Sequence, residues 1–158
     1  MPAKATTITI DVANLLDAAN LDMTVFRKSG ATSFNVNDDN DTKCFVYPGT
    51  TSMTAETRGW SRREISVIIQ VFRFLNEDDA TAQVDGLYEL LENIEDTVDN
   101  TPLGNFECVE FASDSSSREL MDPDTQTSKF TFEAMGEVTY YESYGREPKR
   151  VCQSAAVG

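Results

Sequence analysis

The clearest pattern in the chain is a single apolar stripe over residues 80–98. Five residues recur at intervals of three and four, which places them on one face of a helix: Val84, Leu87, Leu91, Ile94 and Val98. The opposite positions are acidic: Asp85, Glu89, Glu92, Asp96 and Asp99. The acidic run 76–79 suits a helix N-terminus, and the turn residues 101–104 end the segment. We therefore expect one long helix with a buried side and an acidic side.

A shorter helix is predicted over about residues 11–21. Val12, Leu15, Leu16 and Ala19 fall on one face, and Thr9 or Asp11 supplies the N-cap. Residues 1–9 are expected to be a flexible start without an apolar secretory segment.

Strands are predicted at 23–27, 43–47, 64–74, 105–112 and 129–141. The second should stop at Pro48-Gly49. Segment 64–74 is apolar on both faces, which indicates a central strand covered on each side. Segment 129–141 alternates, with Phe130, Phe132, Ala134, Gly136, Val138 and Tyr140 on one face. The polar stretches 29–42, 50–62 and 113–127 are expected to be connections.

The order of helix, strands, helix and strands predicts an α+β fold. We expect a mostly antiparallel β-sheet, one long helix packed on a face and a short N-terminal helix. A chain of 158 residues suits one domain, which should span residues 1–142. Residues 143–158 are expected to be a C-terminal arm, flexible or docked on a partner.

The net charge of the chain limits the kinds of partner that it can bind. Thirteen Lys and Arg against 27 Asp and Glu give a net charge of −14. That balance argues against binding nucleic acid through phosphates and against an anionic membrane surface. Two interpretations remain, namely acidic solubility, or a surface that repels or imitates DNA.

The residues that several common kinds of catalytic and metal-binding site need are missing from the sequence. The chain has no histidine, no phosphate-binding loop and no CxxC pair, and its cysteines are Cys44, Cys108 and Cys152. We expect reduced thiols, with Cys44 and Cys108 as core residues on strands. Asp39-Asn40-Asp41 hints at a calcium loop, but Cys44 stands where the loop needs glycine. No metal and no cofactor are expected, no apolar run is long enough to cross a membrane, and the protein is expected not to be an enzyme.

Three features favour contacts with other proteins. The first is the segment with Arg58, Trp60, Arg62 and Arg63, because arginine beside an aromatic residue is typical of interfaces. The second is the basic tail with Arg146, Lys149 and Arg150. The third is strand 129–141 with Tyr140 and Tyr141, which could pair across subunits at a sheet edge. The alternatives are an exposed loop, a frayed terminus and an ordinary half-buried strand.

With these elements in place, residues 8–142 resemble the tail terminator proteins of long-tailed bacteriophages. The resemblance rests on the short helix, the strand ending Phe45-Val46-Tyr47-Pro48 and the long loop after it. It continues through Arg63-Glu64-Ile65-Ser66-Val67-Ile68-Ile69, the acidic helix with Leu87, Leu90 and Leu91, the strand with Cys108, and Phe130-Thr131-Phe132-Glu133-Ala134. The insert 29–42 and the basic tail do not match the family.

The resemblance implies a non-enzymatic virion protein of the tail and neck, assembled in the host cytoplasm. Six copies would form a ring on the tail tube protein, stop tube growth and meet the head–tail connector protein, while DNA passes through without specific binding. Such a ring would carry about −84, a field that repels phosphates. Candidate channel-lining acids are Glu77, Asp78, Asp79, Asp85, Glu89 and Glu92.

Four alternatives remain open at this point. A head–tail connector or head-completion protein and the tail tube subunit belong to the same structural class. An acidic DNA-mimic inhibitor predicts a monomer or dimer that binds a basic enzyme. An enzyme with a carboxylate pair predicts a deep pocket with acids of raised pKa.

Overall fold

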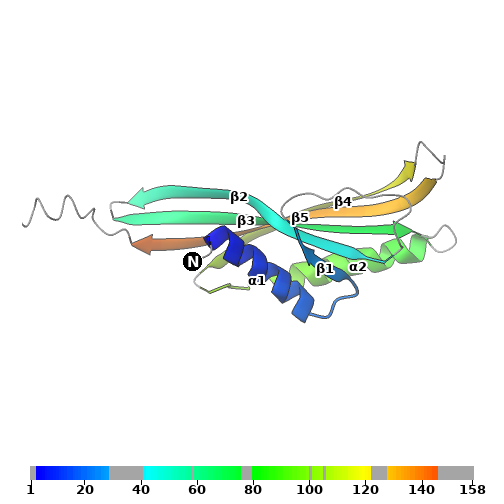
Figure 1. Ribbon diagram of the computed structural model, residues 1–158, viewed down its shortest axis with the longest axis horizontal. Helices are drawn as coiled ribbons and strands as arrows, with labels where there is room; N and C mark the ends of the chain where they lie inside the picture. Colours follow the sequence, from blue (N-terminus) through cyan, green and yellow to red (C-terminus); the bar gives the residue numbers. More distant parts are fainter. Residues whose placement is uncertain are drawn as a thin grey trace, which may run out of the picture.

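A computed structural model describes residues 3–28, 41–57, 59–75, 80–99, 101–104, 106–121 and 128–145. The elements are α1 (Lys4–Ala18), β1 (Thr24–Arg27), β2 (Lys43–Thr57), β3 (Trp60–Leu75), α2 (Ala80–Val98), β4 (Glu107–Met121) and β5 (Ser128–Gly145). The strands form one sheet in the order β1-β2-β3-β5-β4, with β1 parallel to β2 and the other pairs antiparallel. Both helices lie on the same face of this long sheet (Figure 1). The predicted α+β class and mostly antiparallel sheet are confirmed.

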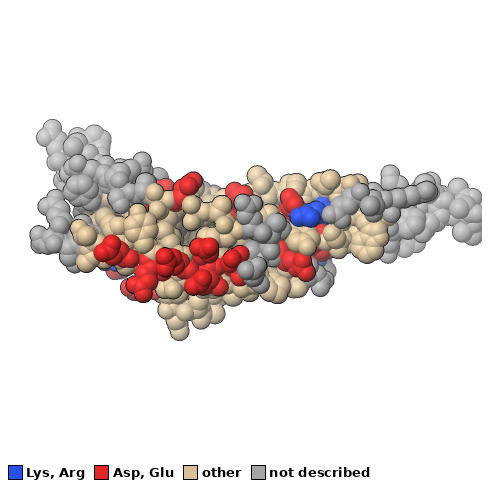
Figure 2. Space-filling model, turned by 180° about the vertical axis from the view of Figure 1, so that it is seen from behind, with Lys and Arg blue, Asp and Glu red and all other residues tan. Residues whose placement is uncertain are grey.

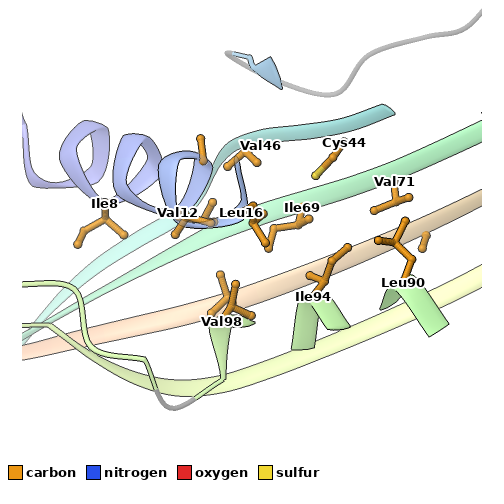
Figure 3. Packing of buried hydrophobic residues seen from close by; sticks show 14 of the residues in the cluster. Ile8, Val12, Leu16, Cys44, Val46, Ile69, Val71, Leu90, Ile94 and Val98 are labelled. Carbon is orange, nitrogen blue, oxygen red and sulfur yellow. The ribbon is translucent and has the colours of Figure 1, made fainter. Parts of the chain in front are cut away.

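The core lies between the two helices and this face of the sheet. Ile8, Val12 and Leu16 of α1 and Leu90, Ile94 and Val98 of α2 point toward the strands (Figure 3). They meet Cys44 and Val46 of β2 and Ile69 and Val71 of β3, all nearly inaccessible to solvent. Fully burying one such side chain contributes about 1.5–3 kcal/mol, so this layer supplies the main stabilisation of the fold.

Helix α2 has its predicted bounds, and β3 has its predicted central position, although it begins at Trp60 rather than at Glu64. α2 spans Ala80–Val98, and the stripe residues Leu87, Ile94 and Val98 are buried. β3 is third of five strands, with Ile65 and Val67 buried on the helix-covered side and Phe72 and Phe74 buried on the other. Neither described helix is long and apolar enough to cross a membrane.

The prediction for the first helix was wrong at both ends. α1 begins at Lys4, so residues 4–9 are helical, and neither Thr9 nor Asp11 caps it. Ile8 continues the stripe of Val12 and Leu16 by one turn, and its burial outweighs the weak helix propensity of the Thr-Ile run. The hydroxyl of Thr9 instead donates to the Ala5 carbonyl oxygen at 2.7 Å. With 15 residues, α1 is only slightly shorter than α2 with 19.

The predicted stop at Pro48-Gly49 is also wrong, because β2 runs through it to Thr57. The strand register shifts between Pro48 and Thr51, which marks a bulge. Proline is tolerated here because β1 pairs only with Lys43–Val46, so that Pro48 lies on an edge. A side chain at position 49 would collide with Ser66, whose Oγ accepts a hydrogen bond from the Thr50 N–H at 2.7 Å.

Two predicted connections are strands. Most of segment 50–62 forms a hairpin of β2 and β3, and residues 113–121 continue β4. The described side chains at 51–55 and 112–115 are exposed on both faces of their strands. A strand without a buried face shows no period of two, so the pattern test misses it. Of the predicted loop 29–42, residues 29–40 lie outside the described part, and Thr42 is buried at the start of β2.

The edge position predicted for strand 129–141 is contradicted by the sheet order. β5 lies between β3 and β4, and it is the outer side of β4 that ends the sheet. The predicted one-sided burial of β5 holds for Phe132, Ala134, Val138 and Tyr140. Residues 143–145 belong to β5 rather than to a separate arm, and residues 146–158 are not described.

Gly136 gives a direct test of the packing on this face. An added Cβ would lie 3.0 Å from two ring atoms of Phe111, so we expect Gly136→Ala to lower the free energy of unfolding by about 1–3 kcal/mol. Gly136→Ala with Phe111→Leu should recover most of that loss. Gly86→Ala in α2 is the control, because nothing lies within 4 Å and alanine there should stabilise by about 1 kcal/mol. Urea unfolding of the three variants and the wild-type chain measures these effects, and equal effects at both glycines would contradict the packing.

Candidate functional site

Three strands run beyond the helices and form a flat projection, here called the sheet extension. It comprises residues 51–57 of β2, 60–64 of β3 and 141–145 of β5, paired in that order, and is seen at the left end of the sheet in Figure 1. Among the described side chains of the extension, none belongs to the hydrophobic core and only Ser61 is buried. A few strands without a packed apolar face are marginally stable in water, so the extension needs other interactions.

Each face of the extension carries one arginine stacked on one tyrosine. On the face away from the helices, Arg62 lies 4.2 Å from the Tyr141 ring centre and its Nε donates to Glu64 Oε1 at 2.9 Å. On the helix-side face, Arg63 lies 4.8 Å from the Tyr144 ring centre. Such pairs contribute about 0.5–1 kcal/mol at exposed positions and tie β3 to β5.

Hydrogen bonds from the two tyrosines extend these stacks to the neighbouring strands. The hydroxyl of Tyr144 donates to the Met53 sulfur of β2 at 3.1 Å. The hydroxyl of Tyr141 donates to Glu107 Oε2 of β4 at 2.7 Å. The extension is therefore held by amphipathic side chains that keep their polar ends in water, which is a composition typical of interfaces.

The sheet extension exposes two large apolar side chains. Trp60 is 52% exposed and Met53 is 63% exposed. Trp60 follows Gly59, which has a φ of +85°, a backbone conformation that glycine adopts without strain. Met53 lies further from the end of the hairpin, paired with Arg63. An exposed tryptophan beside arginines is the kind of side chain that dominates binding energy when a partner covers it.

The sequence-predicted interface residues separate into three groups. Trp60, Arg62, Arg63 and Tyr141 come together on the extension. Tyr140 is fully buried under the helices and is not an interface residue in this chain. The remaining predicted residues lie outside the described part: Arg58, Arg146, Lys149 and Arg150.

Two further residues of the extension were not singled out from the sequence, namely Met53 and Tyr144. Both fell in segments interpreted as a loop and an arm. The sequence does contain a pattern that indicates a strand at Met53. Only Arg58-Gly59 separates Thr57 from its strand partner Trp60. A two-residue connection ending in glycine is a hairpin signal, and it would have predicted that 51–57 pairs with 60–64.

The second candidate surface is the outer side of α2. This helix has five acids and no basic residue: Asp85, Glu89, Glu92, Glu95 and Asp96. All five side chains are exposed, and none of them lies within ion-pairing distance of a basic side chain in the described part of the chain. Figure 2 shows the resulting band of acidic side chains where α2 lies. Of the other predicted channel acids, Glu77, Asp78 and Asp79 lie outside the described residues.

The acids of α2 are arranged at a cost to helix stability. Asp85–Glu89 and Glu92–Asp96 are like-charged pairs four residues apart, which destabilise a helix by about 0.2–0.5 kcal/mol each. Glu95 and Asp96 face the negative end of the helix dipole, and the first turn holds no acid to compensate. Burial of the opposite face, rather than local charge pairing, therefore holds α2 in place.

Other sites in the described part offer little chemistry. A shallow hollow of about 440 Å³ on the face away from the helices is lined by residues that include Ile68, Asp114, Met135 and Glu137. A smaller one of about 200 Å³ lies where Arg73 meets α2, and there Arg73 Nη1 donates to Thr42 Oγ1 at 3.4 Å. Burial raises the pKa of the Cys44 thiol to about 12, so it stays protonated and unreactive at neutral pH. No group of three potential metal ligands exists among the described residues.

Loss of one stack should loosen the extension without unfolding the core. We expect Tyr144→Ala to speed amide hydrogen exchange across residues 51–57 and 60–64 roughly two- to fivefold, which corresponds to about 0.5–1 kcal/mol for a lost cation–π contact. Exchange in α2 should not change. Tyr144→Phe keeps the ring and removes only the hydroxyl bond to Met53; because a thioether sulfur is a weak acceptor, exchange in this control should stay close to wild type. Equal acceleration in α2 would show that the extension is not a separate unit.

A scan against protein-family models found no match for this chain, and a search of curated proteins found none either. Its function is therefore inferred from its own residues and their arrangement.

Proposed function

We propose that the protein is a non-enzymatic structural subunit of a phage tail, which forms a ring on the end of the tail tube and joins it to the head-side connector. In this role it resembles a tail terminator. Its partners are further copies of itself, most simply six, the tail tube protein and the connector protein. It works in the virion after assembly in the host cytoplasm.

The observation that carries the proposal is the sheet extension. A monomeric protein gains nothing from three strands that project beyond their core with an exposed tryptophan, an exposed methionine and two arginines. Placed against a neighbouring subunit, the same residues would bury apolar surface and provide donors for carboxylates. The absence of histidine and of other catalytic patterns in the sequence also favours a role in assembly.

The acidic side of α2 supports the second part of the proposal, a passage for DNA. Five exposed carboxylates on one helix make a surface that phosphates avoid, and six copies multiply the effect. We place Asp85, Glu89 and Glu92 on the channel wall. Like charges on α2 weaken the helix, and this cost is reasonable if the function of the surface is to repel DNA.

A DNA-mimic inhibitor is a second candidate, favoured by the spacing of these same acids. Asp85, Glu89, Glu92 and Asp96 follow one helix face at intervals of roughly 4.5–6 Å along the axis. A mimic would stay a monomer or dimer and bind a basic protein tightly. It leaves the sheet extension unexplained, which is why we rank it second.

The first experiment measures the native mass of the purified chain, alone and with tail tubes. We expect a closed ring of several copies, free or formed only on tube ends. Trp60→Ala should weaken assembly roughly thirtyfold, since an interface tryptophan contributes about 2 kcal/mol or more. Trp60→Phe is the conservative control and should retain part of the affinity. A stable monomer under all conditions, with tight binding to a basic enzyme, would instead establish the mimic.

The second experiment tests the channel wall. Neutralising Asp85→Asn, Glu89→Gln and Glu92→Gln together removes three negative charges per chain, and the rings should then retain short duplex DNA at low salt. Ring mass should not change. The matched control neutralises Asp11, Asp17 and Asp22 to asparagine, which removes the same charge near α1. Equal DNA retention by both variants would show that net charge, and not the α2 surface, repels DNA.

A further inference from the structure

The outer edge of the sheet extension has no strand beside it in the described structure. β1 pairs with β2 only over Lys43–Val46, and the Lys28 N–H adds one bond to the Val46 carbonyl. From Thr51 to Ala55, β2 keeps an unbroken register with β3 on its inner side. No described residue forms a backbone hydrogen bond with the outer side of this stretch. Its N–H and C=O groups are therefore available to another strand.

Few of the usual protections against strand addition are found on this edge. The stretch Thr51-Ser52-Met53-Thr54-Ala55 contains no lysine, no proline and no charge. The register shifts at Pro48/Thr51 and Ala55/Thr57 lie on either side of it and leave it regular. Its side chains are exposed on both faces. A regular and uncharged edge of this kind is a template for pairing with another chain.

The opposite margin of the same sheet offers a complementary edge. β4 is the terminal strand, and its outer side has no strand partner among the described residues. Residues 107–121 carry four acids against one arginine, whereas residues 51–64 carry three arginines against two glutamates. Two β4 edges would repel each other, but a β4 edge and the extension attract.

The strand directions also agree. β2 is antiparallel to β3, β3 to β5 and β5 to β4, so β2 and β4 run in opposite directions. A second copy whose strands run in the same directions as those of the first would present its β4 antiparallel to β2. Antiparallel strand pairs are slightly more stable than parallel ones. Because the two edges differ, such a contact is head-to-tail and repeats from copy to copy, as a ring requires.

We propose that copies of this chain join by strand addition, with β2 residues 51–55 of one copy pairing with the outer edge of β4 of the next. This contact specifies how the assembly proposed above would form, and it rests on that proposal. Exposed Met53 would pack beside the new strand, while Arg63, which is paired with Met53 and has no carboxylate partner among the described residues, would face the acidic β4.

Cross-linking between engineered cysteines tests the contact. Thr54 and Ala112 are both exposed and lie on the face away from the helices, because Thr54 is paired with Arg62 and Ala112 with Glu137. The background carries Cys108→Ser and Cys152→Ser, and buried Cys44 stays. A short bis-maleimide is added to Thr54→Cys, to Ala112→Cys, to their mixture and to the double variant. We expect no product from either single variant, a dimer from the mixture, and from the double variant a ladder rising in steps of 17.5 kDa.

The other outcomes overturn the contact in recognisable ways. Cross-linking of Thr54→Cys alone would show a symmetric β2–β2 pair. Cross-linking of Thr54→Cys to Glu89→Cys, and not to Ala112→Cys, would place the extension on the acidic helix of the next copy. Rings of normal mass without Thr54–Ala112 products refute the strand pairing but keep the proposed function. If the unmodified chain forms no assembly at any concentration or on tubes, the proposed function itself fails.

Discussion

Burial of one sheet face under two helices is the interaction on which the described structure depends. α1 and α2 place Ile8, Val12, Leu16, Ile94 and Val98 against the middle of the strands, and local charge in α2 works against this arrangement rather than for it. The strands are longer than the region that the helices cover. What lies beyond, on β2, β3 and β5, has to be held by cross-strand stacks instead of a core. The packed centre therefore stabilises the fold, and the uncovered projection is the part that the proposed assembly would use for contacts with partners.

The sequence predicts the packed part well, for a physical reason. A helix or strand with one buried face must repeat apolar residues at its own period, and α2 and the middle of β3 do so over many residues. The same rule explains the failures. Residues 51–55 and 112–115 are exposed on both faces and show no repeat of apolar positions, so these parts of β2 and β4 resemble loops in the sequence although they are strands. At α1, packing of Ile8 lengthened the helix beyond the point that propensity suggested.

The candidate site was only partly predictable from the sequence. The sequence shows that arginines gather near a tryptophan in the cluster Arg58, Trp60, Arg62 and Arg63. It does not show which side chains they contact, because those contacts depend on pairing with β5, which lies some eighty residues further along the chain. Only that pairing brings Tyr141 and Tyr144 onto the arginines. The position of β5 inside the sheet likewise depends on long-range pairing, and it removes Tyr140 from the surface. Acids on α2, in contrast, follow directly from helical spacing.

The bulge at Pro48 and Gly49 has a consequence for how such a protein can change over time. It marks the point where β2 leaves the helix-covered region, and Ser66 holds its geometry through Thr50. Beyond this point, substitutions open no voids in the interior, and in the proposed assembly they would alter recognition, so the projection could diverge with its binding counterpart while the scaffold stays under ordinary folding selection. Homologous chains should therefore vary most after the bulge, and engineers could graft new specificities there without redesigning the rest.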